Sequence, residues 1–380
     1  MLIETAIETV ANEWQLHFMI APVDGSMGGG IGPNFAASTG RGGESMASVR
    51  EIAKQAGVSI TTVSRVLNNH PNVSADVRES VLSAVNKVRY VAAVGRRSVN
   101  NVAFVYTGDR SIESPFDAAL LKGISDALED HPYDLMILDA RRARRSDETF
   151  SNLFMRKGVR GAILRASSQS RTVCEAIAAE GFPLVVIGER FPGSTIPYIF
   201  TESRDSSRDA IAYLLDLGHT RVAICLNIVE DADHADRLAG YRDAMTARGL
   251  PVDDSLIWRI PANREGGPQV IKRVTTSVER PTAVYITDPV TCVGAMVEAR
   301  RAGLAIPRDL SIIGFDDGDL RNTVFPSLTA VCQDASALGR ESLLMLETLM
   351  SDEKNTEVKP RSLRCWLELH DTTMRPEPST

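Results

Sequence analysis

The sequence predicts an all-α helix-turn-helix headpiece followed by an α/β core of two doubly wound parallel-sheet halves. Two observations support this fold class. A pair of short, capped helices is encoded within residues 48–69, and from residue 102 onward apolar β-branched runs alternate with helical stretches. With 380 residues, of which 43% are apolar and 24% charged, the chain has room for two or three domains with buried cores.

A capping box marks the start of the first helix. Ser48 and Glu51 lie three residues apart, so each side chain can satisfy a free backbone amide. Gly57 can adopt the positive φ that ends this helix, which we place at about residues 49–55. Ser59 then caps a second helix after a short turn. Such a pair forms a helix-turn-helix whose second helix can enter the DNA major groove, although helix pairs of this length also occur as plain core packing.

The second helix has a buried face and an outer face. Val63, Val66 and Leu67 recur at spacings of three and four, which marks the buried side. A third helix follows the cap Ser74, with valines at positions 77, 81, 85 and 88 facing the other two helices. The side chains left on the outside of the second helix are Ile60, Thr61, Thr62, Ser64, Arg65 and Asn68.

Charge is unevenly distributed along the chain. Residues 46–100 contain eight Lys or Arg and three Asp or Glu, a net charge of +5, whereas residues 1–45 carry −4 and residues 101–380 carry −8. A basic module joined to an acidic body is expected when only the module contacts phosphates. The total of −7 excludes a protein coated in basic surface.

Cysteine usage and hydropathy argue against export. Five scattered cysteines without a CxxC pair predict buried, reduced thiols rather than a disulfide framework. No run approaches the roughly 18 consecutive apolar residues of a membrane span, so we expect no membrane partner. Residues 1–45 lack the basic start and the apolar stretch of a signal peptide. We therefore expect a cytoplasmic protein.

The core shows the same alternation twice. Strand-like runs at 102 (VAFVY), 134 (DLMIL), 161 (GAIL) and 183 (PLVVI) alternate with helical stretches, and runs at 221 (RVAIC), 256 (LIWRI), 282 (TAVYI) and 310 (LSIIGF) repeat the order. This alternation predicts two parallel sheets, each covered by helices on both faces. A binding crevice is then expected between the halves, at the carboxyl ends of the strands.

Catalytic motifs are missing from the sequence. There is no GxSxG, GxxxxGK[ST] or HExxH, and no strand precedes the glycines at 28–32. His219 is better explained as a structural turn residue than as a catalyst. Asp316 and Asp317 could form a carboxylate pair, but after an apolar strand they more often cap the next turn. We expect no catalytic site, no metal site and no cofactor.

The headpiece and the core both resemble one family. The stretch SVREIAKQAGVSITTVSRVLNN at 48–69 is similar to the headpiece of the LacI/GalR (lactose repressor/galactose repressor) family, whose members read IKDVAKLAGVSxxTVSRVLN. Nearly all of 102–370 resembles the regulatory core of that family, which has the fold of periplasmic sugar-binding proteins, with landmarks at 217–224 (LGHTRVAI), 280–288 (RPTAVYITD) and 306–317 (IPRDLSIIGFDD). The resemblance implies a homodimeric, nucleoid-associated transcription regulator, a repressor, that binds a roughly palindromic double-stranded DNA operator and is controlled by a small, sugar-like effector.

Two other classes remain as alternatives. A ligand-binding protein of the periplasmic sugar-binding type would have the same two-lobed core and no DNA role, but the headpiece and the missing export signal oppose it. An enzyme on a similar fold ranks third.

The resemblance also assigns DNA contacts. Ile60 and Thr61 would face base edges, while Ser59, Thr62, Ser64, Arg65 and Asn68 would mostly hold phosphates. In the family a hinge helix inserts a leucine into the minor groove. Arg97 and Val99 fall at that place here, but Gly95 weakens a helix and the linker is short. Either Val99 is a shorter lever or the hinge helix is absent.

For the effector, the residues matched to the family are Phe116, Asp117, Glu189, Arg237 and Asp288. An arginine and a carboxylate can each engage two hydroxyls of a sugar, and an aromatic ring can cover its face. The chain departs from the family at Asp117, where a second phenylalanine is common, and at Glu189, where an aspartate is usual. Pro, Ala and Asn occupy residues 261–263, where the family has an aromatic plate, so the effector's identity does not transfer.

The resemblance divides the chain into five segments. Residues 1–45 form a disordered or spurious extension, 46–93 the headpiece, 94–101 a short hinge, 102–370 the effector-binding core and 371–380 a tail. Because family members begin two or three residues before the first helix, we expect Met46 to be the natural start, with a genuine disordered arm as the alternative. Subdomain one would comprise about 102–200 plus 320–333, and subdomain two about 201–319 plus 334–370. Three crossings between them suit hinge closure around a ligand.

Overall fold

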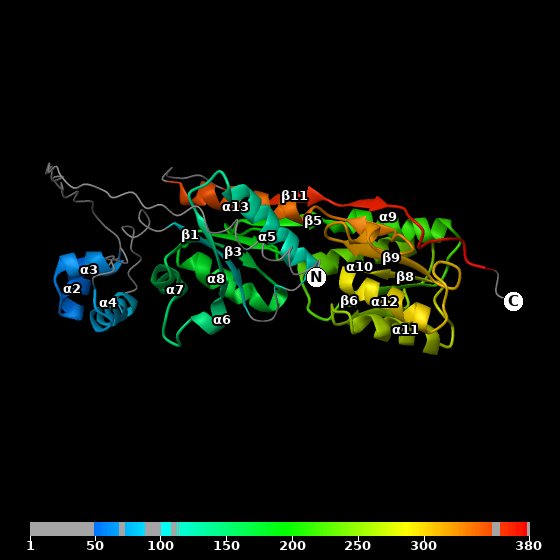
Figure 1. Ribbon diagram of the computed structural model, residues 1–380, viewed down its shortest axis with the longest axis horizontal. Coiled ribbons are helices and arrows are strands. Elements are labelled where there is room, and N and C mark those ends of the chain that lie inside the picture. Colours follow the sequence, from blue (N-terminus) through cyan, green and yellow to red (C-terminus); the bar gives the residue numbers. More distant parts are fainter. Residues whose placement is uncertain are drawn as a thin grey trace, which may run out of the picture. The chain divides into compact units, whose positions relative to one another are not determined.

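The computed structural model describes residues 49–67, 73–87, 100–107, 112, 114–351 and 358–377 (Figure 1). The predictions made for residues 1–45, for Ser48, and for Asn68, Arg97 and Val99 lie outside the described residues.

The headpiece is a three-helix unit with its own core. Its helices are α2 (Val49–Ala56), α3 (Ile60–Leu67) and α4 (Ala75–Lys87). Ile52, Val63 and Val81 come from the three helices and are fully buried against one another. Gly57 has a φ of +65°, and Val58 donates its amide to the carbonyl of Ala53 at 3.0 Å, which ends α2 as the sequence predicted.

The first lobe of the core is built on a six-stranded sheet with the strand order β11-β5-β4-β3-β1-β2. Each pair of neighbouring strands in this sheet is parallel. Its strands are β1 (Asn101–Tyr106), β2 (Asp134–Asp139), β3 (Val159–Arg165), β4 (Leu184–Ile187), β5 (Tyr198–Glu202) and β11 (Arg361–Arg364).

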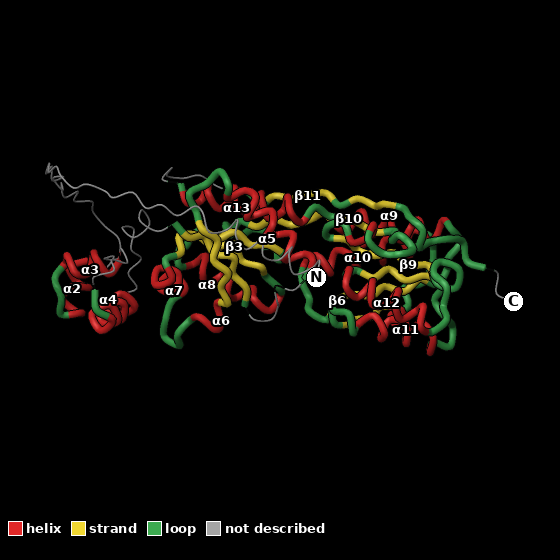
Figure 2. Tube along the Cα trace, viewed as in Figure 1, coloured by secondary structure: helices red, strands yellow, loops and turns green. Residues whose placement is uncertain are grey.

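Helices cover both faces of the first sheet, because successive side chains of its strands point to opposite sides. Phe104 packs with α5 (Pro115–Leu128) and α13 (Ala335–Met350). The next residue, Val105, packs with α7 (Phe150–Lys157) and α8 (Arg171–Ala179) on the other face. A one-turn helix, α6 (Ala140–Ala143), follows β2. Figure 2 shows these helices on either side of the strands.

The second lobe repeats the plan with the strand order β12-β10-β9-β8-β6-β7. Its strands are β6 (Val222–Asn227), β7 (Ile257–Ile260), β8 (Ala283–Ile286), β9 (Ser311–Asp316), β10 (Ala330–Cys332) and β12 (Trp366–Glu368). One face packs on α9 (Ser203–Asp216) and α10 (Ala232–Ala247), and the other on α11 (Gly266–Thr276) and α12 (Pro289–Arg301). Short 3-10 turns span Ser168–Ser170, Asp254–Leu256 and Leu320–Asn322.

The chain crosses between the lobes three times, as predicted, but two segments belong to the lobe opposite to the one expected. We assigned residues 320–333 to the first lobe, yet β10 pairs in parallel with β9 of the second. We assigned 334–370 to the second, yet α13 packs on the first sheet and β11 pairs in parallel with β5. Only the following β12 returns to the second lobe, antiparallel to β10. The partners of these short strands are set by contacts distant in sequence, which local hydrophobicity does not encode.

The cysteines of the core are free thiols, and most of them are buried. Cys174, Cys225, Cys292 and Cys332 are buried free thiols, and Cys365 is partly buried. Among the described residues, no helix is long and apolar enough to cross a bilayer.

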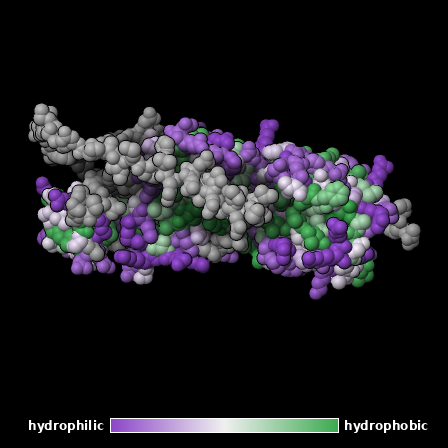
Figure 3. All heavy atoms as spheres, viewed as in Figure 1, coloured by the Kyte–Doolittle hydropathy of each residue, from purple (hydrophilic) through white to green (hydrophobic). Residues whose placement is uncertain are grey.

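Figure 3 shows polar residues spread over the visible face of the described core, with apolar residues gathered in patches between them.

Candidate functional site

The start of α3 is held by its own side chains. Ser59 accepts a hydrogen bond from the amide of Thr62 at 3.1 Å, and the two hydroxyls lie 2.9 Å apart. Ser59 is therefore the N-cap that the sequence predicted. Ser80 of α4 donates to the carbonyl of Ala56 at 3.3 Å and so ties the end of α2 to the third helix.

The outer face of α3 presents the predicted DNA-contacting side chains. Ile60 is 49% exposed although it is apolar, and Thr61 and Arg65 are exposed beside it. Thr62 and Ser64 are half-buried. The face thus offers an apolar side chain, two hydroxyls at its edge and one guanidinium, which suits contact with base edges and phosphates. These contacts remain a prediction.

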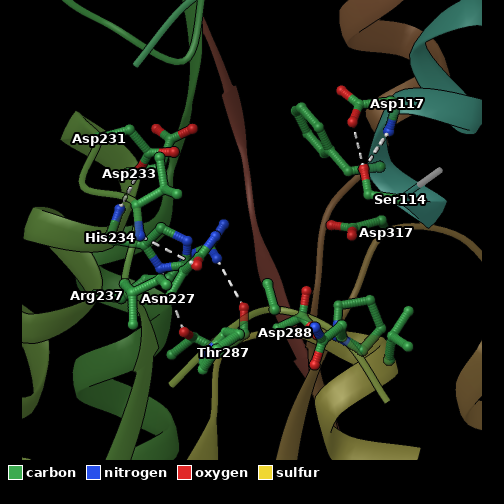
Figure 4. Close-up of a pocket in the computed structure, with 18 of the residues that line it drawn as sticks. Ser114, Asp117, Asn227, Asp231, Asp233, His234, Arg237, Thr287, Asp288 and Asp317 are labelled. Carbon is green, nitrogen blue, oxygen red and sulfur yellow. Dashed lines mark hydrogen bonds between the residues drawn. The ribbon is translucent and has the colours of Figure 1, made fainter. Parts of the chain in front are cut away.

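A cavity of about 540 Å³ lies between the two lobes of the core (Figure 4). Ser114, Phe116, Asp117 and Arg165 line it from the first lobe. Most of the remaining lining comes from the second lobe, from the ends of its strands, the loops that follow them and the first turns of α10: Asn227, Asp231, Asp233, His234, Arg237, Pro261, Asn263, Thr287, Asp288, Asp317 and Gln333. The crevice at the strand ends that the sequence predicted is present.

The first-lobe wall is held by a buried ion pair. Arg165, the last residue of β3, donates from Nε to Oδ1 of Asp117 at 3.2 Å, and its guanidinium lies 4.6 Å from the ring centre of Phe116. Asp117 also accepts from the Ser114 hydroxyl at the start of α5. Gly188 follows β4 with a φ of +90°, and a Cβ there would meet Nη1 of Arg165 at 2.0 Å. Glycine at 188 therefore leaves room for the guanidinium.

Two carboxylates of the second-lobe wall cap helices. Asp231 accepts from the amide of His234 at 2.8 Å at the start of α10. Asp288 accepts from the amide of Thr291 at 2.7 Å at the start of α12. Both aspartates also line the cavity. Burial raises the pKa of Asp288.

Arg237 is fixed at the base of the second-lobe wall. It is only 6% exposed, its guanidinium lies 3.6 Å from the ring centre of Phe315, and Nη1 donates to the carbonyl of Thr287 at 2.9 Å. Its Nε is buried and has no hydrogen-bond partner among the described residues. Buried donors are almost always paired in native proteins, so this N–H is available to a ligand acceptor.

The structure separates the two neighbouring aspartates 316 and 317. Asp316 accepts from the amides of Gly318, Leu320 and Arg321, which is the capping role that the sequence favoured for the pair. Asp317 instead lines the cavity, where Gln333 donates to it. Burial raises the pKa of Asp317 from 3.8 to about 7. His219 is structural, since its ring bonds to Thr282 and to the carbonyl of Met374.

Four of the five predicted effector residues come together around the cavity: Phe116, Asp117, Arg237 and Asp288. Glu189 does not line it. Its carboxylate accepts from the amide of Arg190 at 3.0 Å and from Arg171 at 3.4 Å, and it borders a second hollow. Sequence reasoning missed Arg165, Asp231, Asp233, His234 and Asp317. Arg165 ends β3 and Asp317 directly follows β9, so the signal for these two is a position at the end of a strand of a doubly wound sheet, whereas the other three lie at the start of α10.

Several bonds bridge the lobes beside the cavity. The amide of Ser168 donates to the carbonyl of Glu230 at 3.1 Å. Arg190, which follows β4, donates to Asp236 on α10 at 2.5 Å, and its guanidinium stacks 4.0 Å from the ring centre of Phe200. These contacts link the two lobes next to the cavity.

A helix-turn-helix head with an exposed second helix, together with a two-lobed core that has an interlobe cavity, defines a class of protein, the ligand-responsive transcription regulators. Residues 48–92 match the model of bacterial regulatory proteins, lacI family, and residues 211–372 match a periplasmic binding protein-like domain. The chain is 32% identical over 310 residues to the HTH-type transcriptional repressor CytR of Escherichia coli strain K12. This alignment covers 80% of this chain and 89% of that protein.

The chain belongs to the lacI family, and it is a DNA-binding transcription regulator. Two solved structures share its fold. The transcriptional regulator CelR–cellobiose complex has a TM-score of 0.64 at 24% identity, over 86% of this chain and 99% of that one. The lac repressor dimer bound to operator and the anti-inducer ONPF has a TM-score of 0.62 at 22% identity, over 87% and 100% of the two chains.

Proposed function

We propose that this protein is a cytoplasmic, nucleoid-associated repressor that binds an operator as a homodimer through the outer face of α3. In this proposal Ile60 and Thr61 face base edges, whereas Arg65 holds a phosphate. A single headpiece buries too little interface for operator-level affinity, so two copies on a palindromic site are expected. Similarity in fold to a lac repressor dimer bound to operator supports this arrangement.

We further propose that a small polar effector in the interlobe cavity controls DNA binding. The cavity is lined by both lobes, and the bonds from Ser168 to Glu230 and from Arg190 to Asp236 join the lobes next to it. An effector that contacts both walls favours one arrangement of the lobes, and through it one spacing of the two headpieces. The observation that best supports a regulator over a transport-type binding protein is the capped helix-turn-helix with Ile60 exposed on its outer face.

The interface is tested with Arg65→Ala in a titration of the full chain against promoter-region duplexes at several salt concentrations. Loss of one phosphate contact should weaken binding to all sequences alike, and the slope of log K against log salt should fall by about 1. Arg308→Ala removes an exposed arginine from the core, where Arg308 pairs with Asp309, and should leave both quantities unchanged. Equal behaviour of the two variants would contradict the proposed interface.

A further inference from the structure

The interlobe cavity has an excess of acidic groups. Five carboxyls line its walls, from Asp117, Asp231, Asp233, Asp288 and Asp317, against the guanidiniums of Arg165 and Arg237. Arg264 and Glu265 lie at the exposed rim and offset each other. Even with His234 protonated, the carboxyls outnumber the cations. Figure 4 shows Asp231 and Asp233 on one side of the cavity and Asp117 and Asp317 on the other.

The cations on the walls do not neutralise this excess. Arg165 pairs with Asp117, and Nη1 of Arg237 donates to a backbone carbonyl, that of Thr287. Arg190 approaches Asp233 at 3.5 Å but lies closer to Asp236, at 2.5 Å. The hydrogen bonds that Asp288 and Asp317 accept in the described structure come from neutral donors, among them the backbone amide of Thr291 and the side-chain amide of Gln333.

Buried carboxylates are costly to ionise, and the pKa values of three carboxyls in the cavity are raised accordingly. Burial raises the pKa of Asp233, of Asp288 and of Asp317, because each ionised form is poorly solvated. An entering cation would offset that cost, whereas an entering anion would add to it. The cavity also offers one donor that needs an acceptor, the buried Nε of Arg237.

Apolar contact in the cavity comes from one aromatic ring and several aliphatic side chains, among them Ile228, Val229, Pro289 and Val290. Phe116 is the aromatic residue of the described lining, and Arg165 lies over its ring. Asn227, Thr287 and Gln333 add neutral polar groups. A ligand that satisfies the polar groups of these walls must present several hydrogen-bond donors and at least one oxygen acceptor.

We propose that the cavity binds a small polyhydroxylated molecule that carries an amine, such as an amino sugar, and rejects phosphorylated or carboxylated sugars. Its ammonium group lies among the carboxyls of Asp233, Asp288 and Asp317, and a hydroxyl or ether oxygen accepts from Nε of Arg237. The inference depends on the proposed effector role of the cavity and names the chemical class of that effector.

The test uses matched sugar triples in which one hydroxyl, at the same carbon, is kept, replaced by an amine or phosphorylated. Each compound is titrated against the full chain by calorimetry at pH 7, over several pentose and hexose stereochemistries. In at least one triple the amine should bind about tenfold or more tightly than the hydroxyl, and the phosphate should bind most weakly. Tighter binding of phosphates, no preference for amines, or no binding by any amine would overturn the inference.

Variants that remove a single carboxylate charge show which residues of the cavity produce its preference for amines over hydroxyls. Asp233→Asn and Asp317→Asn should each reduce the ratio of amine to hydroxyl affinity severalfold, whereas Asp243→Asn, an exposed carboxyl paired with Arg204, should not change it. If one of the two cavity variants fails to fold, the ratio of amine to hydroxyl affinity measured for the other variant and for the wild-type protein still tests the inference. DNA binding without ligand is measured on the same preparations. A chain that binds DNA but shows no amine preference contradicts this inference alone, and a chain that binds no duplex contradicts the proposed function.

Discussion

Arg165 and Asp117 form a buried ion pair, with Nε 3.2 Å from Oδ1, where the end of β3 meets the start of α5. Removing one partner of such a pair leaves an uncompensated buried charge, which costs about 3–5 kcal/mol. Arg165→Met should therefore lower the melting temperature substantially, and adding Asp117→Asn to it should recover part of the loss. Arg204→Met breaks an exposed Arg–Asp pair, with Asp243, and should change the melting temperature little. Equal losses for the two single variants would contradict a special role for the buried pair.

Gly188 is required by space as well as by conformation. Its φ of +90° strains any other residue, and a Cβ would also meet Arg165 at 2.0 Å. Gly193 has a φ of +75° with nothing within 4 Å of a Cβ, so Gly193→Ala is a control for backbone strain alone. Gly188→Ala should lower the melting temperature more than Gly193→Ala and should weaken ligand binding, which calorimetry measures. Matching effects of the two substitutions would show that Arg165 can move aside freely.

The headpiece core should be separable from its DNA-contacting face. Ile52 is fully buried, so Ile52→Ala should destabilise the headpiece by about 2–5 kcal/mol. Amide exchange in α2, α3 and α4 should accelerate by more than tenfold, while ligand binding to the core stays unchanged. Ile60→Ala removes an exposed side chain of similar size. Ile60→Ala should leave amide exchange unchanged but alter the preference for DNA bases. Faster amide exchange in Ile60→Ala would contradict the assignment of Ile60 to the outer face of α3.

Much of the fold could be predicted from local sequence, because caps and hydrophobic periods act over a few residues. Gly57 ends α2, Ser59 caps α3, and β-branched runs form the central strands. The assignment of β10 and β11 to their lobes was wrong, because those strands choose hydrogen-bond partners far away in sequence. No local property of a three- or four-residue strand specifies such partners.

The residues that line the cavity were only partly predictable from the sequence, because the direction of a side chain depends on the fold. Asp316 and Asp317 are adjacent in sequence, and both follow a buried strand, but opposite directions of their side chains make one a cap and the other a cavity wall. Asp231 and Asp233 were not singled out, because a cap and a cavity residue look alike in sequence. Glu189 was selected by resemblance, and its ion pair with Arg171 depends on the fold.

Asp317 should make stability depend on pH. Its folded-state pKa of about 7 lies above the ordinary 3.8, so the folded protein binds this proton more tightly than the unfolded chain between these values. The free energy of unfolding should therefore fall as the pH rises through that interval and level off above it. Asp317→Asn should flatten the fall in urea titrations between pH 4 and pH 8. Asp319→Asn, at an exposed carboxyl, should not, and an unchanged curve for Asp317→Asn would contradict the burial of a proton at this site.

The central claim, that α3 reads DNA for a regulator, is tested most directly by selection of full-chain binding sites from a random duplex library. The account predicts enrichment of one roughly palindromic sequence, bound about 10³-fold or more tightly than random duplex at moderate salt, with Arg65→Ala weakening binding to both. If no sequence were enriched over random duplex, the claim would be contradicted.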